Sequence, residues 1–383
     1  MLLPRRQFLR FAAAGAGAIL VNPQMALASV ATDRRFVFII QRGAADGLNI
    51  VVPYGDNEYL SLRREIAVDP GTAIKLDGHF ALNPAMPEAG KMFSAGQALF
   101  VHATASPYRD RSHFDGQNVL ETGGTTPYAQ RDGWMNRLVG LMPRSKDEAI
   151  AFAATVPPAL RGPVDVTSFA PSGLPQPTDD LLARVGRMYQ GDAQLHPMWD
   201  EALAARGMAA GQAPGQKHED LGRLAASFLA KPDGPRIAML ETGGWDTHTG
   251  EGGRLTAQLR ALDTMVAALR DDLGPVWNQT VVLVATEFGR TAAVNGTGGT
   301  DHGTASAAML FGGAVKGGRV MADWPGLSQS SLYEQRDLKP TIGLDAVITG
   351  VAAESFAIDP ERAGKALFPT ANFGRPPEGL IHA

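Results

Sequence analysis

The sequence predicts an α/β protein built on a mostly parallel sheet. One observation is a set of five apolar runs typical of buried strands: Arg35–Arg42, Ala98–Thr104, Arg236–Thr242, Thr280–Thr286 and Ala307–Gly312. Helical stretches separate these runs, and this alternation favours parallel pairing. The chain has 383 residues, 44% of them hydrophobic, which is enough for one large α/β domain or two smaller ones.

Each apolar run adjoins a polar cluster rich in Asp, Glu, His or Ser. Four runs lead into clusters that contain Asp46, Ser112, Asp246 and Glu287, and the fifth run follows the cluster 300–303. Open α/β sheets bind ligands beyond the carboxyl ends of their strands, so four clusters fall on one edge. The fifth joins them if its loop crosses back over that edge. Carboxylates and imidazoles gathered in this way are typical of a metal site.

Hydrophobic periodicity predicts the helices between these strands. The clearest is Arg254–Leu273, where leucines and one valine recur at steps of three or four residues. It lies between two predicted strands and so completes a βαβ unit. Further helices are expected over Met86–Phe93, Ser112–Leu120 and Leu344–Ala353.

We expect residues 29–383 to form one α/β domain with a helical insertion at about 148–233. The insertion begins with a possible strand, Ala149–Thr155, and continues through a turn-rich stretch that contains several prolines. Three amphipathic helices follow, over Asp180–Tyr189, Pro197–Arg206 and Asp220–Ala230. None of them carries a cluster of acidic residues and histidines, so we expect this segment to cover one side of the sheet.

The first 28 residues have the pattern of an export signal. Arg5 and Arg6 precede a weakly apolar stretch that ends at Val21, and Ala26-Leu27-Ala28 forms a small-x-small cleavage site. The pattern resembles a twin-arginine signal, although Pro4 stands where Ser or Thr is usual. The apolar stretch is too short and mild for a membrane anchor. We therefore expect a soluble mature protein, periplasmic or secreted, that is exported by the twin-arginine machinery.

The composition narrows the possible ligands. A formal net charge of −4 without a basic run gives no reason to expect nucleic acid. The chain has no cysteine, which excludes disulfides, thiolate metal sites and cysteine nucleophiles. A metal must therefore be held by oxygen and imidazole, and this donor set favours one or two divalent ions, with Zn or Mn ahead of Ca or Mg.

The most specific motif lies in 243–250 and contains Asp246 and His248. The two residues are two positions apart, so on a strand end their side chains can point the same way. Glycines on both sides allow the backbone to approach an ion closely. The alternative is an Asp-capped turn beside a surface histidine.

Three further residues are candidate metal ligands. His302 ends a glycine-rich loop that a bound metal would order, with Asp301 supporting it; the alternative is a disordered loop that caps the next strand. Glu287 directly follows a strand, but a local ion pair with Arg290 would explain it equally well. Asp46 is similarly open to interpretation as an Asx turn before the next glycine.

The segment 108–117 has the groups needed for nucleophilic catalysis. Ser112 stands at a predicted helix N-terminus close to Arg109 and Arg111, so an anionic substrate is favoured there. Arg109, Arg111 and Arg290 are candidate anion clamps. The alternative for Ser112 is an ordinary helix cap with exposed arginines beside it.

These motifs resemble those of the bacterial family called domain of unknown function 1501. The resemblance rests on SPYRDRSHFDGQ, ETGGWDTHTG and ATEFGRTAAVNGTGGTDHG, which occur in order along the chain together with the twin-arginine start. The family is grouped with the alkaline phosphatase and sulfatase clan. The resemblance implies a three-layer α/β/α sandwich, a metal site at Asp46, Asp246, His248, Glu287 and His302, and Ser112 as the nucleophile.

The sequence differs from the clan pattern in three ways. Asp246 and His248 are closer in sequence than the clan spacing, and Phe288 replaces an expected imidazole. Asp46 is displaced into its loop. The leading hypothesis is an exported metal-dependent hydrolase of phosphate or sulfate esters that acts on an anionic substrate. The alternative is a catalytically silent exported protein that keeps the fold and binds another exported protein.

Overall fold

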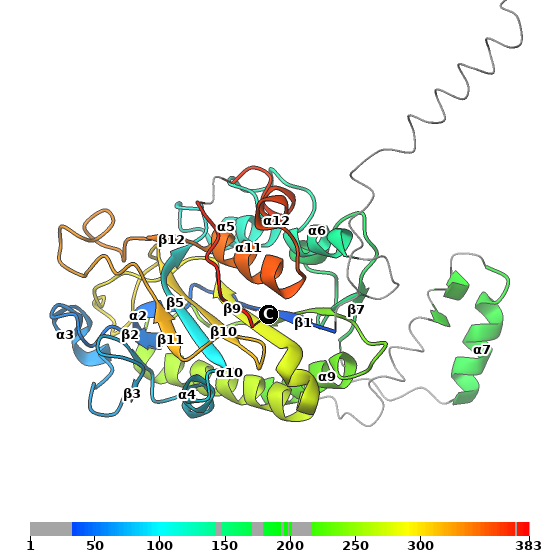
Figure 1. Ribbon diagram of the computed structural model, residues 1–383, viewed down its shortest axis with the longest axis horizontal. Coiled ribbons are helices and arrows are strands. Elements are labelled where there is room, and N and C mark those ends of the chain that lie inside the picture. Colours follow the sequence, from blue (N-terminus) through cyan, green and yellow to red (C-terminus); the bar gives the residue numbers. More distant parts are fainter. Residues whose placement is uncertain are drawn as a thin grey trace, which may run out of the picture.

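A single twisted sheet forms the centre of the molecule (Figure 1). The computed structural model describes residues 33–142, 148–170, 179–192, 195–197, 199–200, 217–371 and 374–382. The predicted export signal, residues 1–28, lies outside this part of the chain. The strand order is β11-β5-β10-β9-β1-β8-β6-β7, and β12 pairs with β5. These strands are β1 Arg35–Gln41, β5 Ala98–Ala105, β6 Ala149–Ala151, β7 Thr167–Ser168, β8 Ile237–Thr242, β9 Thr280–Thr286, β10 Ser306–Phe311, β11 Arg319–Met321 and β12 Ile342–Gly343.

The sheet is parallel except at β10. This strand runs antiparallel to both β5 and β9, whereas β1 pairs in parallel with β8 on one side and β9 on the other. Because β10 is reversed, the loop before it lies at the edge where β9 ends. An antiparallel bridge between Arg290 and His302 continues this pairing beyond the strands. The fifth polar cluster therefore joins the other four through the direction of its strand.

Helices cover both faces of the sheet (Figure 1). Phe36, Phe38 and Ile40 of β1 point to one core, while Val37 and Ile39 point to the other, as the strand period of two requires. The first core contains side chains of α6 Trp134–Leu141, α11 Leu344–Ser355 and α12 Pro360–Leu367, and the second contains side chains of α4 Pro87–Ser94, α9 His218–Leu229 and α10 Glu251–Leu273. The predicted three-layer sandwich with a mostly parallel sheet is confirmed.

The helix α10 connects β8 to β9 across the middle of the sheet. It begins three residues before the predicted start, and the leucines and valine that defined its periodicity are all buried. Its register therefore follows from the sequence pattern.

The segment 148–233 contributes strands as well as helices. β6 pairs with β8, and β7 pairs with β6, so both extend the main sheet at one edge. The helix α7, Asp179–Tyr189, lies beside the sandwich in Figure 1. The predicted helix over Pro197–Arg206 falls mostly outside the described residues.

The remaining elements are a small second sheet and several short helices. A small sheet has the order β2-β4-β3 and follows the short helix that Asp46 caps. These elements are α2 Gly47–Ile50, β2 Val51–Val52, α3 Tyr59–Arg63, η1 Arg64–Ile66, β3 Ile74–Lys75, β4 Ala81–Leu82, α5 His113–Thr122, η2 Pro158–Leu160 and η3 Gly274–Gln279.

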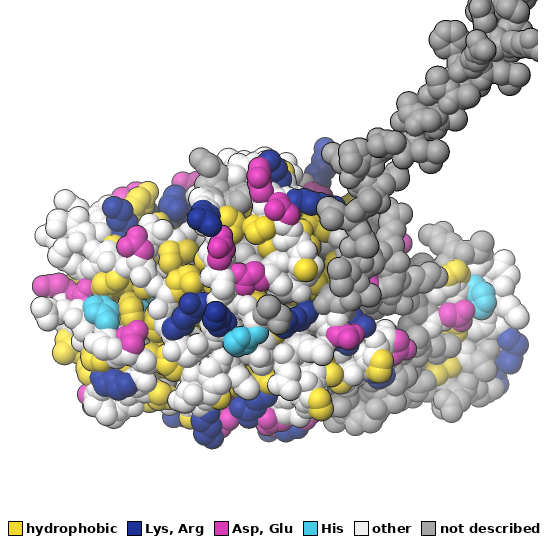
Figure 2. Space-filling model, in the orientation of Figure 1, with side chains coloured by type: hydrophobic (Ala, Val, Ile, Leu, Met, Phe, Trp, Pro, Cys, Tyr) yellow, Lys and Arg dark blue, Asp and Glu magenta, His cyan; other side chains and the backbone are white. Residues whose placement is uncertain are grey.

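The surface carries charges of both signs. Figure 2 shows basic and acidic side chains interspersed over one face, in keeping with the small net charge. None of the helices in the described part of the chain has the length and hydrophobicity that crossing a bilayer requires.

Candidate metal centre

Three imidazoles and one carboxylate meet at the carboxyl edge of the sheet. His113 is the first residue of α5, Asp246 and His248 follow β8, and His302 precedes β10. Asp246 Oδ1 lies 3.0 Å from His248 Nε2 and 3.3 Å from His302 Nε2, and its Oδ2 lies 3.4 Å from His113 Nε2. His248 Nε2 and His302 Nε2 are 3.0 Å apart. Three segments that are distant in sequence thus bring donor atoms of four residues together.

The other nitrogen of each imidazole is held by an acceptor. His113 Nδ1 lies 2.9 Å from Glu287 Oε1, His248 Nδ1 lies 3.0 Å from Asp301 Oδ1, and His302 Nδ1 lies 2.9 Å from the carbonyl oxygen of Arg111. A neutral imidazole has one ring hydrogen, and these contacts place it on Nδ1. All three Nε2 atoms are therefore left as lone-pair donors.

The charges of the supporting carboxylates agree with this assignment. Burial alone would raise the pKa of Glu287, but hydrogen bonds from His113 and Gln117 hold it below its usual range. Burial would likewise raise the pKa of Asp301, and hydrogen bonds from Asn295 and His248 lower it. Both carboxylates are therefore ionised at neutral pH and accept hydrogen bonds.

The histidines themselves titrate in opposite directions. The hydrogen bond to Glu287 raises the pKa of His113, whereas burial lowers the pKa of His302. A proton therefore competes with a metal more strongly at His113 than at His302.

A divalent metal ion fits this donor set. Two unprotonated nitrogens at 3.0 Å repel each other unless a cation lies between them, and His113 Nε2 is buried without a hydrogen-bond partner in the described structure. Zn–N distances of about 2.0–2.1 Å separate the ligand atoms of a tetrahedral site by about 3.3–3.4 Å, which is close to the separations given above. Ligand atoms of His113, Asp246 and His302 all lie within 4.8 Å of one another.

Arg290 holds the carboxylate of the centre in place. Its side chain is fully buried, and its Nη1 lies 2.6 Å from Asp246 Oδ1. The same guanidinium donates to Thr300 through Nε, at 3.1 Å from Oγ1, and through Nη2 to the carbonyl oxygen. Burial raises the pKa of Asp246, but Arg290 outweighs it and the pKa is lowered. Arg290, which was predicted to bind an anionic substrate, therefore pairs with Asp246 of the protein itself.

The glycine-rich loop that carries His302 is ordered by protein contacts. Asn295 Nδ2 and Thr297 Oγ1 both donate to the carbonyl oxygen of His248, at 2.9 and 2.7 Å. A Cβ atom on Gly299 would lie 2.4 Å from that same carbonyl, so only glycine fits there. The loop therefore packs against the Asp246–His248 segment without needing a metal to order it.

Two residues predicted as ligands have other partners. The carboxylate of Asp46 forms a bidentate ion pair with the buried Arg63, at 2.6 and 2.9 Å, and accepts from Leu48 N as the cap of α2. Glu287 supports His113 instead of joining the group of donor atoms, and it also accepts from Gly43 N at 2.8 Å. The structure does not bring either carboxylate into the cluster.

Ser112 lies directly before the ligand-like His113. It occupies the N-cap position of α5, but its side chain makes no capping hydrogen bond. Its neighbour Arg111 has a φ of +58°, a strained conformation that directs the Arg111 carbonyl toward His302. The Arg111 side chain pairs with Glu334 and Asp337, and Arg109 donates to backbone carbonyls. The arginines predicted as anion clamps are therefore bound to protein acceptors.

The sequence reasoning missed the role of His113. It placed this histidine in the same polar cluster as Ser112 but considered only the serine as functional. His113 could have been predicted, because an imidazole stands in a polar cluster that topology assigns to the carboxyl edge of the sheet.

Fold and centre together define an α/β/α protein with three histidines and one aspartate at the carboxyl edge of its sheet. The chain belongs to the family described as "Protein of unknown function (DUF1501)", whose model matches residues 69–367. A comparison with curated proteins finds no match.

Solved structures of low sequence identity align with most of the chain. The C-terminal periplasmic domain of EcEptC from Escherichia coli, in complex with Zn, is 11% identical, with a TM-score of 0.42 over 91% of this chain and 92% of that chain. A protein in the alkaline phosphatase superfamily from Vibrio parahaemolyticus is 11% identical, with a TM-score of 0.41 over 84% of this chain and 66% of that one. Phosphonate monoester hydrolase of Agrobacterium radiobacter is 11% identical, with a TM-score of 0.34 over 89% and 79%. At these values the function has to be inferred from the residues of the centre.

Proposed function

We propose that this protein is an exported, metal-dependent hydrolase of phosphate or sulfate esters. The observation that carries the proposal is the position of Ser112, which directly precedes His113 and leaves its hydroxyl unused as a helix cap. A candidate nucleophile directly before His113 supports the proposal, because the donor atoms of the centre suit Zn or Mn.

The residues of the centre would divide the work as follows. His113, Asp246, His248 and His302 would hold the ion, which supplies positive charge for the oxygens of the ester group. Ser112 Oγ would form a bond to phosphorus or sulfur as the bond to the alcohol oxygen breaks. The alcohol leaves with the proton of the serine, and water then hydrolyses the seryl ester.

The two arginines would act by positioning other groups. Arg290 would fix Asp246, and Arg111 would fix His302 through its backbone carbonyl. The N–H groups in the first turn of α5 would favour an anionic ester beside Ser112. Export rests on the Arg5-Arg6 pattern and the following cleavage site, which support a periplasmic or secreted location.

A second candidate function is a catalytically silent exported protein that binds a partner. The donor set favours it in one respect, because three histidines and a carboxylate fill a four-coordinate zinc and leave no position for substrate. A five- or six-coordinate Mn or Fe would keep a position open.

Two measurements test the proposal. Protein purified from its native host after export is analysed for metals, and the same sample is assayed with aryl phosphates and aryl sulfates. We expect bound Zn, Mn or Fe and turnover that is lost in Ser112→Ala while metal content is unchanged. Bound metal with no turnover, and full biological function in Ser112→Ala, would favour the silent binding protein.

A further inference from the structure

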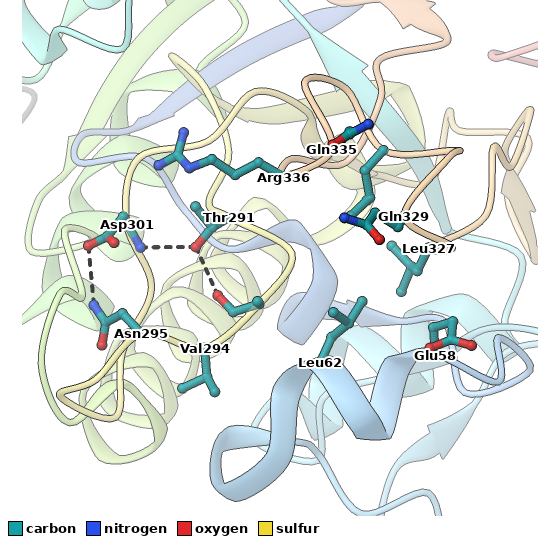
Figure 3. Close-up of a pocket in the computed structure, with 12 residues that line it drawn as sticks. Glu58, Leu62, Thr291, Val294, Asn295, Asp301, Leu327, Gln329, Gln335 and Arg336 are labelled. Atoms are coloured by element: carbon teal, nitrogen blue, oxygen red, sulfur yellow. Dashed lines mark hydrogen bonds between the residues drawn. The ribbon is translucent and has the colours of Figure 1, made fainter.

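A cavity of about 460 Å³ lies next to the candidate metal centre. Figure 3 shows the residues that line it. Three segments that are distant in sequence form it: residues 58–62, 291–301 and 327–336. Its size falls within the range of about 300–1,000 Å³ that is usual for small-molecule sites. The proposed hydrolysis uses none of these side chains directly, so the cavity has no assigned role.

The cavity shares a wall with the metal centre. Asp301 lines the cavity and accepts the hydrogen bond of His248 Nδ1 at 3.0 Å. Arg336 also lines it and donates to the carbonyl oxygen of His302 at 2.9 Å. The segment that supplies His302 therefore has the cavity on one side and the donor cluster on the other.

The charges that line the cavity do not suit an anion. Glu58 and Asp301 are carboxylates, and the Arg336 guanidinium is the one cation among the lining residues. This cation lies 3.4 Å from Asp337, so part of its charge is already matched. A phosphate or sulfate group would be repelled here, and the ester group is better placed at the centre itself.

The uncharged groups of the cavity suit a hydroxyl-rich molecule. The side-chain amides of Gln329 and Gln335 are exposed and make no hydrogen bond within the described residues. Amides donate and accept, as hydroxyl groups do, and the carboxylate of Glu58 adds an acceptor. Leu62 and Leu332 also line the cavity and supply apolar surface, which suits the C–H face of a ring.

We propose that this cavity binds the neutral sugar or polyol part of the substrate, so that the substrate is a phosphate or sulfate ester of a hydroxyl-rich alcohol. This inference rests on the proposed hydrolase function for its reaction, but the binding of the neutral part can be measured without turnover. The alcohol would occupy the cavity while its ester group reaches past Asp301 to the donor cluster.

The experiment measures binding of neutral probes by ligand-observed NMR and calorimetry. The probes are methyl glucoside, methyl galactoside, N-acetylglucosamine, maltose and sorbitol, each with wild-type protein and two variants. Ala293→Trp fills the cavity from an exposed lining position, and Gln335→Ala removes one amide. We expect millimolar binding of at least one probe, loss of that binding in Ala293→Trp, and about 2- to 13-fold weaker binding in Gln335→Ala, the range for one hydrogen bond.

Matched readouts separate this inference from the proposed function. Both variants should keep the metal content and melting temperature of the wild type, and inorganic sulfate should not displace the bound probe. Absence of binding by every probe, or equal binding by wild type and Ala293→Trp, would overturn the inference even if the protein hydrolyses aryl esters. Binding that Ala293→Trp abolishes would uphold the cavity assignment even if no ester is hydrolysed.

Discussion

The contribution of Glu287 to the metal centre can be isolated by replacing it with glutamine. Its buried Oε1 accepts from Gly43 N, His113 Nδ1 and Gln117 Nε2 at 2.8, 2.9 and 3.0 Å, and its Oε2 accepts from Thr286 Oγ1 at 2.9 Å. A glutamine can keep its carbonyl oxygen toward the three donors and direct its NH₂ group to the Thr286 hydroxyl. That hydroxyl can accept in the variant, because its single hydrogen can be donated instead to the Gln41 carbonyl oxygen at 2.8 Å. The substitution therefore removes a charge with little change of shape.

The expected effect is on metal affinity. The negative charge behind His113 makes the imidazole a stronger donor, and loss of such a partner typically costs about 10–100-fold in affinity. This corresponds to about 1.4–2.7 kcal/mol of binding free energy. Because Glu287 is fully buried and salt screens its charge little, we expect the upper half of this range. Titration of metal-free protein with Zn or Mn, by calorimetry or by competition with a coloured chelator, measures it.

A matched control distinguishes this effect from general destabilisation. Asp263 is a buried carboxylate of α10 that accepts from Glu88 N and Ala89 N at 3.0 and 2.8 Å. It lies 12 residues from the N-terminus of α10, or about 18 Å along the helix axis. Asp263→Asn should lower the melting temperature and leave metal affinity unchanged. Wild-type affinity in Glu287→Gln, or an equal loss in Asp263→Asn, would refute the reasoning.

Three further predictions follow from the centre and its surroundings. His113→Ala, His248→Ala and His302→Ala should each reduce metal content in elemental analysis of the folded variants, whereas His79→Ala should not; unchanged content in all would exclude these ligands. Wild-type protein should bind one ion per chain and lose melting temperature on chelation, because an ion bound only to the folded chain stabilises it; two tightly bound ions would contradict this count. Burial and a neighbouring carboxylate raise the pKa of Glu251 from 4.5 to about 8, so its stabilising contribution is complete below pH 4.5 and is lost as pH rises through about 8. The loss of unfolding free energy reaches up to about 5 kcal/mol. Urea unfolding should show that the unfolding free energy of Glu251→Gln varies less with pH than that of the wild type.

The fold was predictable because its signals are local and repeated. Apolar runs marked every long strand, and the periodicity of leucines along α10 identified its buried face. The edge strand β6 covers only the first three residues of the possible strand Ala149–Thr155, and the two-residue β7 was not predicted. Strands this short carry too little alternation to stand out from the turn-rich stretch around them.

The centre was predictable only in part, for a physical reason. Topology places clusters at one edge of a sheet, and this was enough to bring Asp246, His248 and His302 together. It does not determine which side chains in those clusters point toward one another. Asp46 points to Arg63, a partner 17 residues away that carries no periodic signal. His113 points to the centre because it is the first residue of α5. The start of this helix follows the strained Arg111, and the sequence does not signal that conformation.

The expectation of a single ion has its reason in the buried charges around Asp46. Arg63 is fully buried, forms a bidentate pair with Asp46, and lies 3.9 Å from Glu251. Because the raised pKa of Glu251 keeps it protonated at neutral pH, the guanidinium already balances the one negative charge, that of Asp46. A divalent ion bound by Asp46 would leave the guanidinium short of its partner, and breaking a buried pair costs about 3–5 kcal/mol. Phe288 stacks on His113, with ring centroids 5.1 Å apart, at the position where the family resemblance implies an imidazole. A hydrolase built on this centre would therefore have no second ion at the leaving oxygen, and protein groups would have to stabilise it.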